Sequence, residues 1–180
     1  MKPLLMLPVV AVGLLLTGCE GIPTPSLLSL ESAVTDQDAA PDVPLAGAWE
    51  SSNSDPVCLI HKEKDGAFSV VYLVGNSTLA LKGRLFRIGE ALILDLIPAG
   101  DDDFSVAGHS FARVWVTGNT LRWAFLDSDW LKEQLAALPS YTTDDRTLLL
   151  ATGPAVRASL EKVAADERAP STEVIWQRMQ

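Results

Sequence analysis

From Leu45 onward, short runs of β-prone residues alternate with turn-forming dipeptides, and this pattern restricts the possible folds more than any other feature. Gly, Asn and Asp accept the positive φ of tight hairpin turns, and they occur here as Asp65-Gly66, Gly75-Asn76, Gly89-Glu90 and Gly118-Asn119. The seven successive runs are LAGAWES, VCLIHKE, AFSVVYLV, TLALKGRLFRI, ALILDLI, HSFARVWV and TLRWAFLD. Strands joined in this way form an antiparallel meander.

Alternation within the strands places apolar side chains on both faces of some of them. Phe111 and Trp115 share one face of their strand, opposite Val114, and Leu121 and Trp123 share a face of the next. A sheet that is apolar on both faces must be covered, and closure into a barrel also removes exposed strand edges. We therefore expect a mainly β protein whose meander closes into a barrel. A small sandwich or a half-open barrel with a packed interior is the alternative.

Two helices and a final strand complete the predicted domain, which covers residues 45–180. Apolar residues recur at helical spacing in SDWLKEQLAAL, residues 128–138, and in TGPAVRASLEKVAAD, residues 152–166. Between the helices, RTLLLAT is typical of a strand. After them, TEVIWQRM predicts a last strand that could pair with the first.

This order of barrel, helix and closing strand resembles the lipocalins and the wider calycin group. Their opening Gly-x-Trp motif is matched by Gly47 and Trp49. In that family the Trp packs across the closed end of the barrel against an Arg, for which Arg146 is the match in chain order and Arg178 a competitor. The family's Thr-Asp-Tyr motif is absent, and the helix at 128–138 has no counterpart there. The resemblance implies a barrel that holds an apolar or amphipathic small molecule.

Aromatic side chains on the predicted strands are the candidates for such a pocket. In a barrel that is open at one end they would line an apolar ligand site, and in a closed one they would form its core. The candidates are Trp49, Phe68, Tyr72, Phe111, Trp115 and Trp123.

Residues 1–18 have the layout of a signal peptide. Lys2 precedes an apolar stretch from Leu4 to Leu16, followed by the small residues Thr17 and Gly18. A membrane-spanning helix needs about 20 apolar residues, so this stretch is short for an anchor.

The four residues Leu16 to Cys19, LTGC, resemble the lipobox of bacterial membrane lipoproteins. In that family the cysteine thiol takes a diacylglyceryl group, the peptidase cuts before the cysteine, here between Gly18 and Cys19, and the new amine is acylated. The resemblance implies that Cys19 attaches the protein to a membrane through acyl chains. Because Glu20 rather than Asp follows the cysteine, the resemblance favours the outer membrane, facing the periplasm.

Residues 19–44 are predicted to form a flexible tether between the lipid and the domain. Four prolines and several serines lie between Glu20 and Pro44, and no hydrophobic period is sustained there except in SLLSL at 26–30.

The net charge of −9 limits the partners of the chain. An acidic surface argues against nucleic acid and against peripheral binding to anionic lipid. Membrane attachment is therefore expected to come from the acyl chains.

No catalytic, cofactor or metal motif is present. Cys58 is expected to be a buried thiol, and His61 and His109 are expected at a strand surface and as a loop-edge hydrogen bonder. The run Asp101–Asp103 near His109 has the composition of a cation site, but it lacks the glycine and glutamate of a calcium loop and is expected to be a solvated loop. We predict a protein without enzymatic activity, cofactor or metal.

Two functions follow from these patterns. The first is a lipid-anchored envelope protein that binds an apolar or amphipathic small molecule in its barrel. The alternative is an accessory module that docks to another envelope protein, with SLLSL and the acidic loops as candidate contact surfaces.

Overall fold

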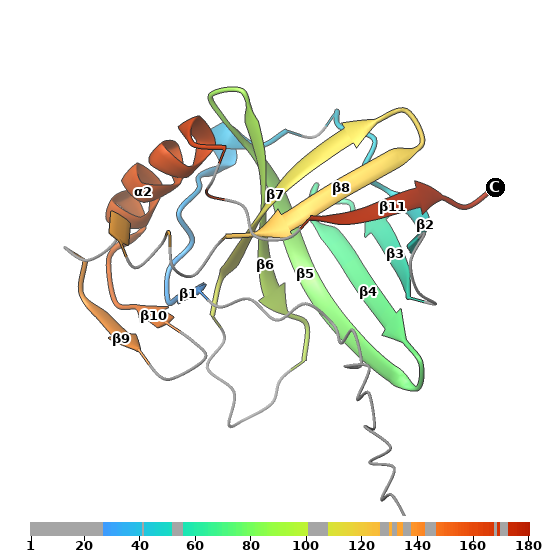
Figure 1. The fold of residues 1–180 in the computed structure, drawn as a ribbon, viewed down its shortest axis with the longest axis horizontal. Helices are drawn as coiled ribbons and strands as arrows, with labels where there is room; N and C mark the ends of the chain where they lie inside the picture. Colours follow the sequence, from blue (N-terminus) through green and yellow to red (C-terminus); the bar gives the residue numbers. More distant parts are fainter. Residues whose placement is uncertain are drawn as a thin grey trace, which may run out of the picture.

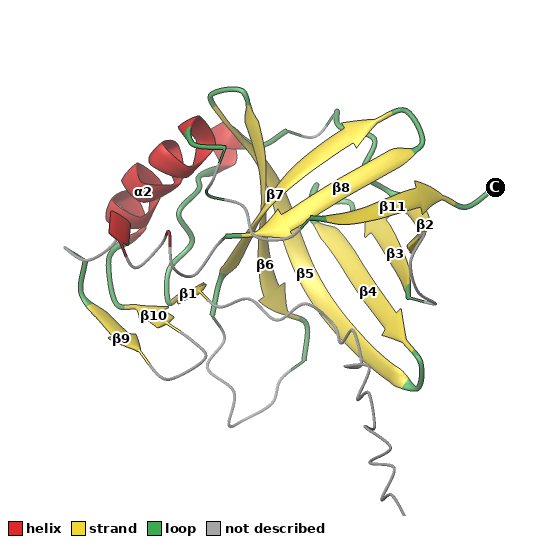
Figure 2. Ribbon diagram, in the orientation of Figure 1, coloured by secondary structure: helices red, strands yellow, loops and turns green. Residues whose placement is uncertain are grey.

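Eight antiparallel strands close into a barrel in the computed structural model of the chain (Figure 1). The structure describes residues 27–40, 42–51, 56–100, 108–126, 130, 133–134, 138–142, 147–167, 169 and 173–180. A helix and a small sheet lie to one side of the barrel, as Figure 2 shows.

The barrel consists of the predicted meander and the predicted last strand. Neighbouring strands follow the order β11-β2-β3-β4-β5-β6-β7-β8, so β11 closes the barrel between β8 and β2. Gly75 and Gly118 have positive φ at two of the hairpin turns, where the sequence placed tight turns. The strands are β2 Gly47–Ser51, β3 Val57–Lys62, β4 Phe68–Val74, β5 Ser77–Ile88, β6 Ala91–Pro98, β7 Ser110–Thr117, β8 Thr120–Phe125 and β11 Val174–Arg178. The predictions of a mainly β fold, an antiparallel meander and a closing strand are confirmed.

A separate three-stranded sheet lies outside the barrel. Its order is β1 (Leu27–Ser29), β10 (Thr147–Leu149) and β9 (Ser140–Thr142), with β1 and β10 parallel. β10 confirms a strand within RTLLLAT, but this strand pairs with β1 and β9 rather than with the barrel.

The helix α2 (Gly153–Ala165) confirms the helix predicted at 152–166. Pro154 is tolerated because it lies in the first turn, where a backbone N–H has no helical partner. Near the C-terminus α2 is the one α-helix whose bounds the described residues define, so the predicted count of two is not supported. Within 128–138 the described residues Trp130, Glu133 and Gln134 are helical. Most of residues 128–138 lie outside the described part of the chain. In the part that is described, no helix is both long and apolar enough to cross a bilayer.

Two hydrophobic clusters lie on the two sides of the barrel wall. Alternate residues of β6 point to opposite sides, so Leu94 and Leu96 belong to the interior cluster and Ile93 to the outer one. The helix α2 and the strand β10 pack on the outer cluster through Val156, Leu160, Val163 and Leu149.

The N-terminal segment from Leu27 lies against the barrel. Ala40 donates its N–H to the carbonyl of Leu85 over 2.9 Å, and Leu45 is fully buried with the barrel interior. The 3-10 helix η1, Asp36–Asp38, is joined to α2 by an ion pair between Asp38 and Arg157. Part of the segment assigned to the tether from its sequence is thus packed on the domain, because its scattered small apolar residues fill gaps without any regular period.

Candidate functional site

The Gly-x-Trp motif lies at one end of the barrel, as the resemblance implied. The guanidinium carbon of Arg178 lies 4.1 Å from the centre of the Trp49 ring, and this group donates hydrogen bonds to the carbonyls of Pro44 at 2.7 Å and Ala46 at 2.8 Å. The Trp49 indole N–H donates to the carbonyl of Leu45 over 3.0 Å. Arg178 is therefore the stacking partner that the structure describes, and Arg146 lies outside the described residues.

Four of the predicted aromatic residues lie inside the barrel, and the sequence analysis missed a fifth, Trp176. Trp49 and Trp176 are 0% exposed, Phe68 1%, Trp123 3% and Tyr72 4%. The Trp176 ring lies 5.2 Å from that of Tyr72 and 5.9 Å from that of Trp123, both nearly perpendicular. Of the two roles left open by the sequence, these contacts are those of a core.

The indole N–H groups of Trp123 and Trp176 have no hydrogen-bond partner among the described residues. Each is a donor within an apolar interior, and an unsatisfied buried donor lowers the free energy of unfolding by about 1–3 kcal/mol.

Phe111 and Trp115 lie on the outside of the barrel. Phe111 belongs to the outer cluster beneath α2 and β10. Trp115 lies between two guanidinium groups, with Arg113 at 5.2 Å and Arg122 at 5.1 Å from its ring centre. Strand alternation placed the two rings on one face, but it could not indicate which face points inward.

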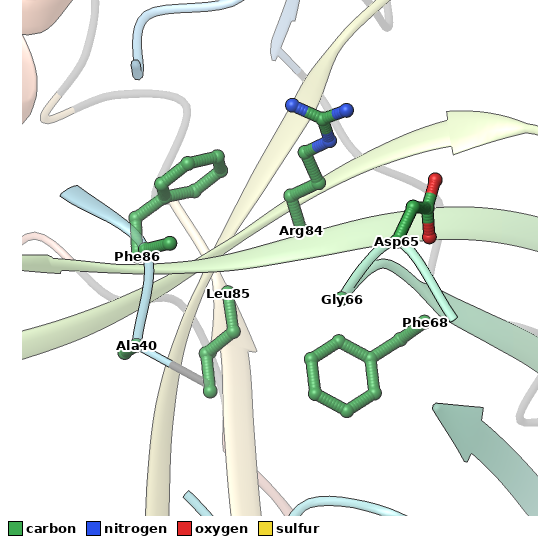
Figure 3. A pocket seen from close by; sticks show the side chains of 8 residues that line it. Ala40, Asp65, Gly66, Phe68, Arg84, Leu85 and Phe86 are labelled. Atoms are coloured by element: carbon green, nitrogen blue, oxygen red, sulfur yellow. The ribbon is translucent and has the colours of Figure 1, made fainter. Parts of the chain in front are cut away.

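A pocket opens in the barrel wall where β5 extends past β4. Phe68, the first residue of β4, pairs with Gly83, and residues 84–88 of β5 continue beyond it. The N-terminal segment pairs with this extension through Ala39 and Ala40. The gap between that segment and the Asp65–Gly66 turn is a cavity of about 230 Å³, which we call the wall pocket. Figure 3 shows Arg84 and Phe86 on one side of the strand, and Leu85 and Phe68 on the other.

A second cavity, of about 320 Å³, adjoins the wall pocket, and we call it the outer groove. The two cavities share Asp65 and Arg84, so they lie side by side and charged side chains line both. The outer groove is lined by Ser32, Asp65, Ala67, Lys82, Gly83, Arg84, Asp95, Ile97 and His109.

A buried carboxylate orients the histidine of the outer groove. Asp95 is 5% exposed, and its Oδ1 lies 2.8 Å from Nδ1 of His109. The Ser32 hydroxyl donates to Oδ2 of the same carboxylate over 2.8 Å. In a Ser-His-Asp triad the hydroxyl meets the imidazole instead, so this arrangement is not a nucleophilic triad. His109 is a hydrogen bonder at the start of β7, as predicted, and the sequence gave no sign of its partner Asp95.

Cys58 is a poor candidate for a nucleophile. The side chain is fully buried, and burial raises the pKa of its thiol to about 12. His61 is exposed on the same strand, away from it. Among the described residues, no three His, Cys, Asp or Glu side chains form a group that could hold a metal. Gly18, Cys19 and Asp101–Asp103 lie outside the described residues.

Comparisons of the chain with protein-family models, with curated proteins and with solved structures gave no match. The class of this protein therefore follows from its fold. It is a closed, eight-stranded antiparallel β-barrel, consistent with the lipocalin-like barrel that the sequence predicted.

Proposed function

We propose that this chain is a lipid-anchored bacterial envelope protein, without enzymatic activity, that binds a small amphipathic molecule in the wall of its barrel. The position of the wall pocket beside the outer groove, with Asp65 and Arg84 lining both, is the observation that supports this function most directly. Phe68, Leu85 and Phe86 line one end, where each is almost fully buried, and Lys82 and His109 line the other.

The chemistry of the two cavities defines the class of ligand. Binding sites of small molecules are mostly apolar, with a few polar groups that fix orientation. A short apolar group fits the wall pocket of about 230 Å³. A hydrogen-bonding or acidic head group suits the outer groove, where Lys82 and Arg84 lie beside the carboxylates of Asp65 and Asp95. Asp95 is already engaged by the imidazole of His109, which leaves the two basic side chains for the head group. The proposed ligand site is therefore in the barrel wall rather than among the aromatic rings of the centre.

The N-terminal sequence supports the location. Two or three acyl chains on Cys19 would hold the protein on a bilayer almost permanently, since each buried methylene contributes about 0.8 kcal/mol. Glu20 after the cysteine favours the outer membrane, with the domain in the periplasm.

Binding of an anionic amphiphile to the purified full chain tests the ligand site, with 8-anilinonaphthalene-1-sulfonate as the fluorescent probe. We expect Lys82→Ala to weaken binding about fivefold to thirtyfold, because one charge-assisted hydrogen bond contributes roughly 1–2 kcal/mol. Lys162→Ala, which removes an exposed lysine of α2 that lines neither cavity, is the control. Equal affinity in wild type and Lys82→Ala would contradict the site. Labelled palmitate supplied to cells, with Cys19→Ser as control, separately checks the anchor.

A further inference from the structure

We propose that the outer face of the sheet β1-β10-β9 lies on the membrane surface to which the chain is anchored. This proposal rests on the proposed anchoring at Cys19, and it assigns the orientation of the domain. The sheet lies at one side of the molecule, remote from the β4–β5 turn (Figure 1).

The strand register places a continuous apolar face on this sheet. Leu28 pairs with Leu148 and Leu148 with Tyr141, so these three side chains share one face. Leu30 and Leu150 extend it by the same alternation, and Leu30 donates its N–H to the carbonyl of Leu149. The opposite face packs on the barrel side, where Leu149 and Ser29 are fully buried.

Three of the five side chains on the outer face are exposed, and Leu28 and Leu148 are half-buried. Tyr141 is 64% exposed, Leu150 51% and Leu30 47%. In the described part of the chain six large hydrophobic residues are exposed, and these three share one short sheet, while Leu59, Ile175 and Met179 are on or next to barrel strands. A concentration of apolar side chains of this kind marks an interaction surface.

The length of the chain before β1 identifies the bilayer as the occupant. Leu27 follows Cys19 by eight residues, which span at most about 29 Å when fully extended. As a flexible coil the same length spans about 16 Å on average. β1 is therefore the first described strand after an acylated Cys19, and the short connection keeps it near the bilayer. The apolar face lies on the sheet to which β1 belongs.

The chemistry of the face suits a lipid surface. Leucine side chains enter the boundary between head groups and acyl chains, and tyrosine is enriched at that depth. None of the five side chains is charged, so the contact needs no attraction to anionic lipid, which a chain of net charge −9 would repel. The segment that follows β1 supplies Ser32 to the outer groove and Ala40 to the wall pocket, so the same stretch connects the membrane face with the ligand site.

Site-specific fluorescence on the full, processed chain tests this orientation in vesicles of phosphatidylethanolamine and phosphatidylglycerol at 3:1. The probe is an environment-sensitive fluorophore on Leu150→Cys or Tyr141→Cys, with Thr78→Cys at the β4–β5 turn as the matched control. Cys58 is buried and Cys19 is acylated, so neither competes for the label in the native protein. We expect nitroxide-labelled lipid to quench the two sheet probes at least threefold more than the Thr78→Cys probe.

Equal, weak quenching at all three positions in protein whose Cys19 acylation has been verified by mass would overturn the orientation but leave the anchor intact. Absence of acylation would instead overturn the anchor. Sheet probes that are shielded from aqueous iodide in native membranes, but not quenched by labelled lipid, would show that a protein covers the face and would also overturn the proposal.

Discussion

Gly47, the first residue of β2, and Arg178, the last residue of β11, constrain one another at one end of the barrel. A Cβ atom at position 47 would lie 2.3 Å from Nη1 of Arg178, far inside the contact distance. The missing side chain lets the guanidinium lie over Trp49 and reach the carbonyls of Pro44 and Ala46. The glycine of the Gly-x-Trp motif is thus required by the arginine at the other end of the chain.

A double-mutant cycle measures this dependence. Gly47→Ala should destabilise by about 2 kcal/mol, because the methyl group displaces the guanidinium. Arg178→Ala should cost about 1–2 kcal/mol, since the stacking and the hydrogen bonds are partly exposed to solvent. In the double variant the methyl group at position 47 meets no guanidinium. Its loss of unfolding free energy should therefore be smaller, by at least about 0.5 kcal/mol, than the sum of the two single losses. Urea unfolding of the four proteins gives these values, and strict additivity would show that the two residues act independently.

Contacts between individual residues could be predicted from the sequence only where the residues belong to a known motif. Gly47 and Trp49 were found because three adjacent positions hold the pattern, but the choice between Arg146 and Arg178 depends on the register of β11. Asp95 and His109 lie on neighbouring strands, and nothing in the local sequence of either indicates the other. The wall pocket combines residues near 40, 66 and 85, which come together only in the folded barrel.

Among the elements, the N-terminal segment contacts α2 through two acidic side chains. At the start of α2 the N–H of Gly153 donates to the carboxylate of Glu31 over 2.7 Å, and one turn further on Arg157 pairs with Asp38. Asp38 accepts a hydrogen bond from the Arg157 guanidinium and two more from the N–H and hydroxyl of Thr35. The hydrogen bond from Arg157 is the main reason that the pKa of Asp38 is lowered from 3.8 to about 2. A lowered pKa in the folded state means that the contact stabilises above about pH 4 and is lost as the pH falls toward 2.

Acid should therefore release this segment before the barrel unfolds. Between pH 4 and pH 2 we expect the docking of residues 27–44 to weaken by about 1 kcal/mol, less than the pKa difference alone implies because solvent screens the pair. Asp38→Asn should lower the stability at pH 7 and flatten this pH dependence, whereas Asp42→Asn, in the same segment, should do neither. Hydrogen exchange of residues 33–40 measures the docking, and an unchanged pH profile in Asp38→Asn would contradict the assignment.

The elements that the sequence predicted well are those that local signals specify. Each hairpin of the meander has its own turn residues and its own alternation, so the order β2 to β8 could be predicted from sequence alone. A strand was predicted in RTLLLAT, where β10 lies, but β1 has only three residues and was not predicted. The two strands pair across more than a hundred residues, and no local signal indicates that pairing. The same lack of periodicity led to residues 27–44 being predicted as a tether.

For the whole molecule, β11 determines whether the barrel closes. Without it β2 and β8 would each present an unpaired edge, and exposed edges promote aggregation. Its central residue Trp176 contacts the rings of Tyr72 and Trp123, which lie on β4 and β8. Closure thus brings together side chains from three distant parts of the chain, and we expect the described barrel to unfold in a single cooperative transition.

Substitutions at neighbouring positions of β11 compare a buried side chain that helps to close the barrel with an exposed one. Trp176→Ala should destabilise the protein by about 3–5 kcal/mol, because it empties the space between the two other rings of the interior. Ile175→Ala, its neighbour on the same strand, should cost less than about 1 kcal/mol, since Ile175 is 43% exposed and Trp176 is 0% exposed. Guanidinium unfolding followed by circular dichroism gives both values, and equal losses would contradict the role of Trp176.

Trp176→Phe then tests whether a bound molecule lies in the barrel interior next to the indole N–H of Trp176. It keeps an aromatic ring and removes an N–H that has no partner among the described residues, so we expect a loss of less than about 1.5 kcal/mol. A loss near that of Trp176→Ala would mean that the N–H donates to a bound acceptor. In that case the barrel centre, rather than its wall, would hold the ligand.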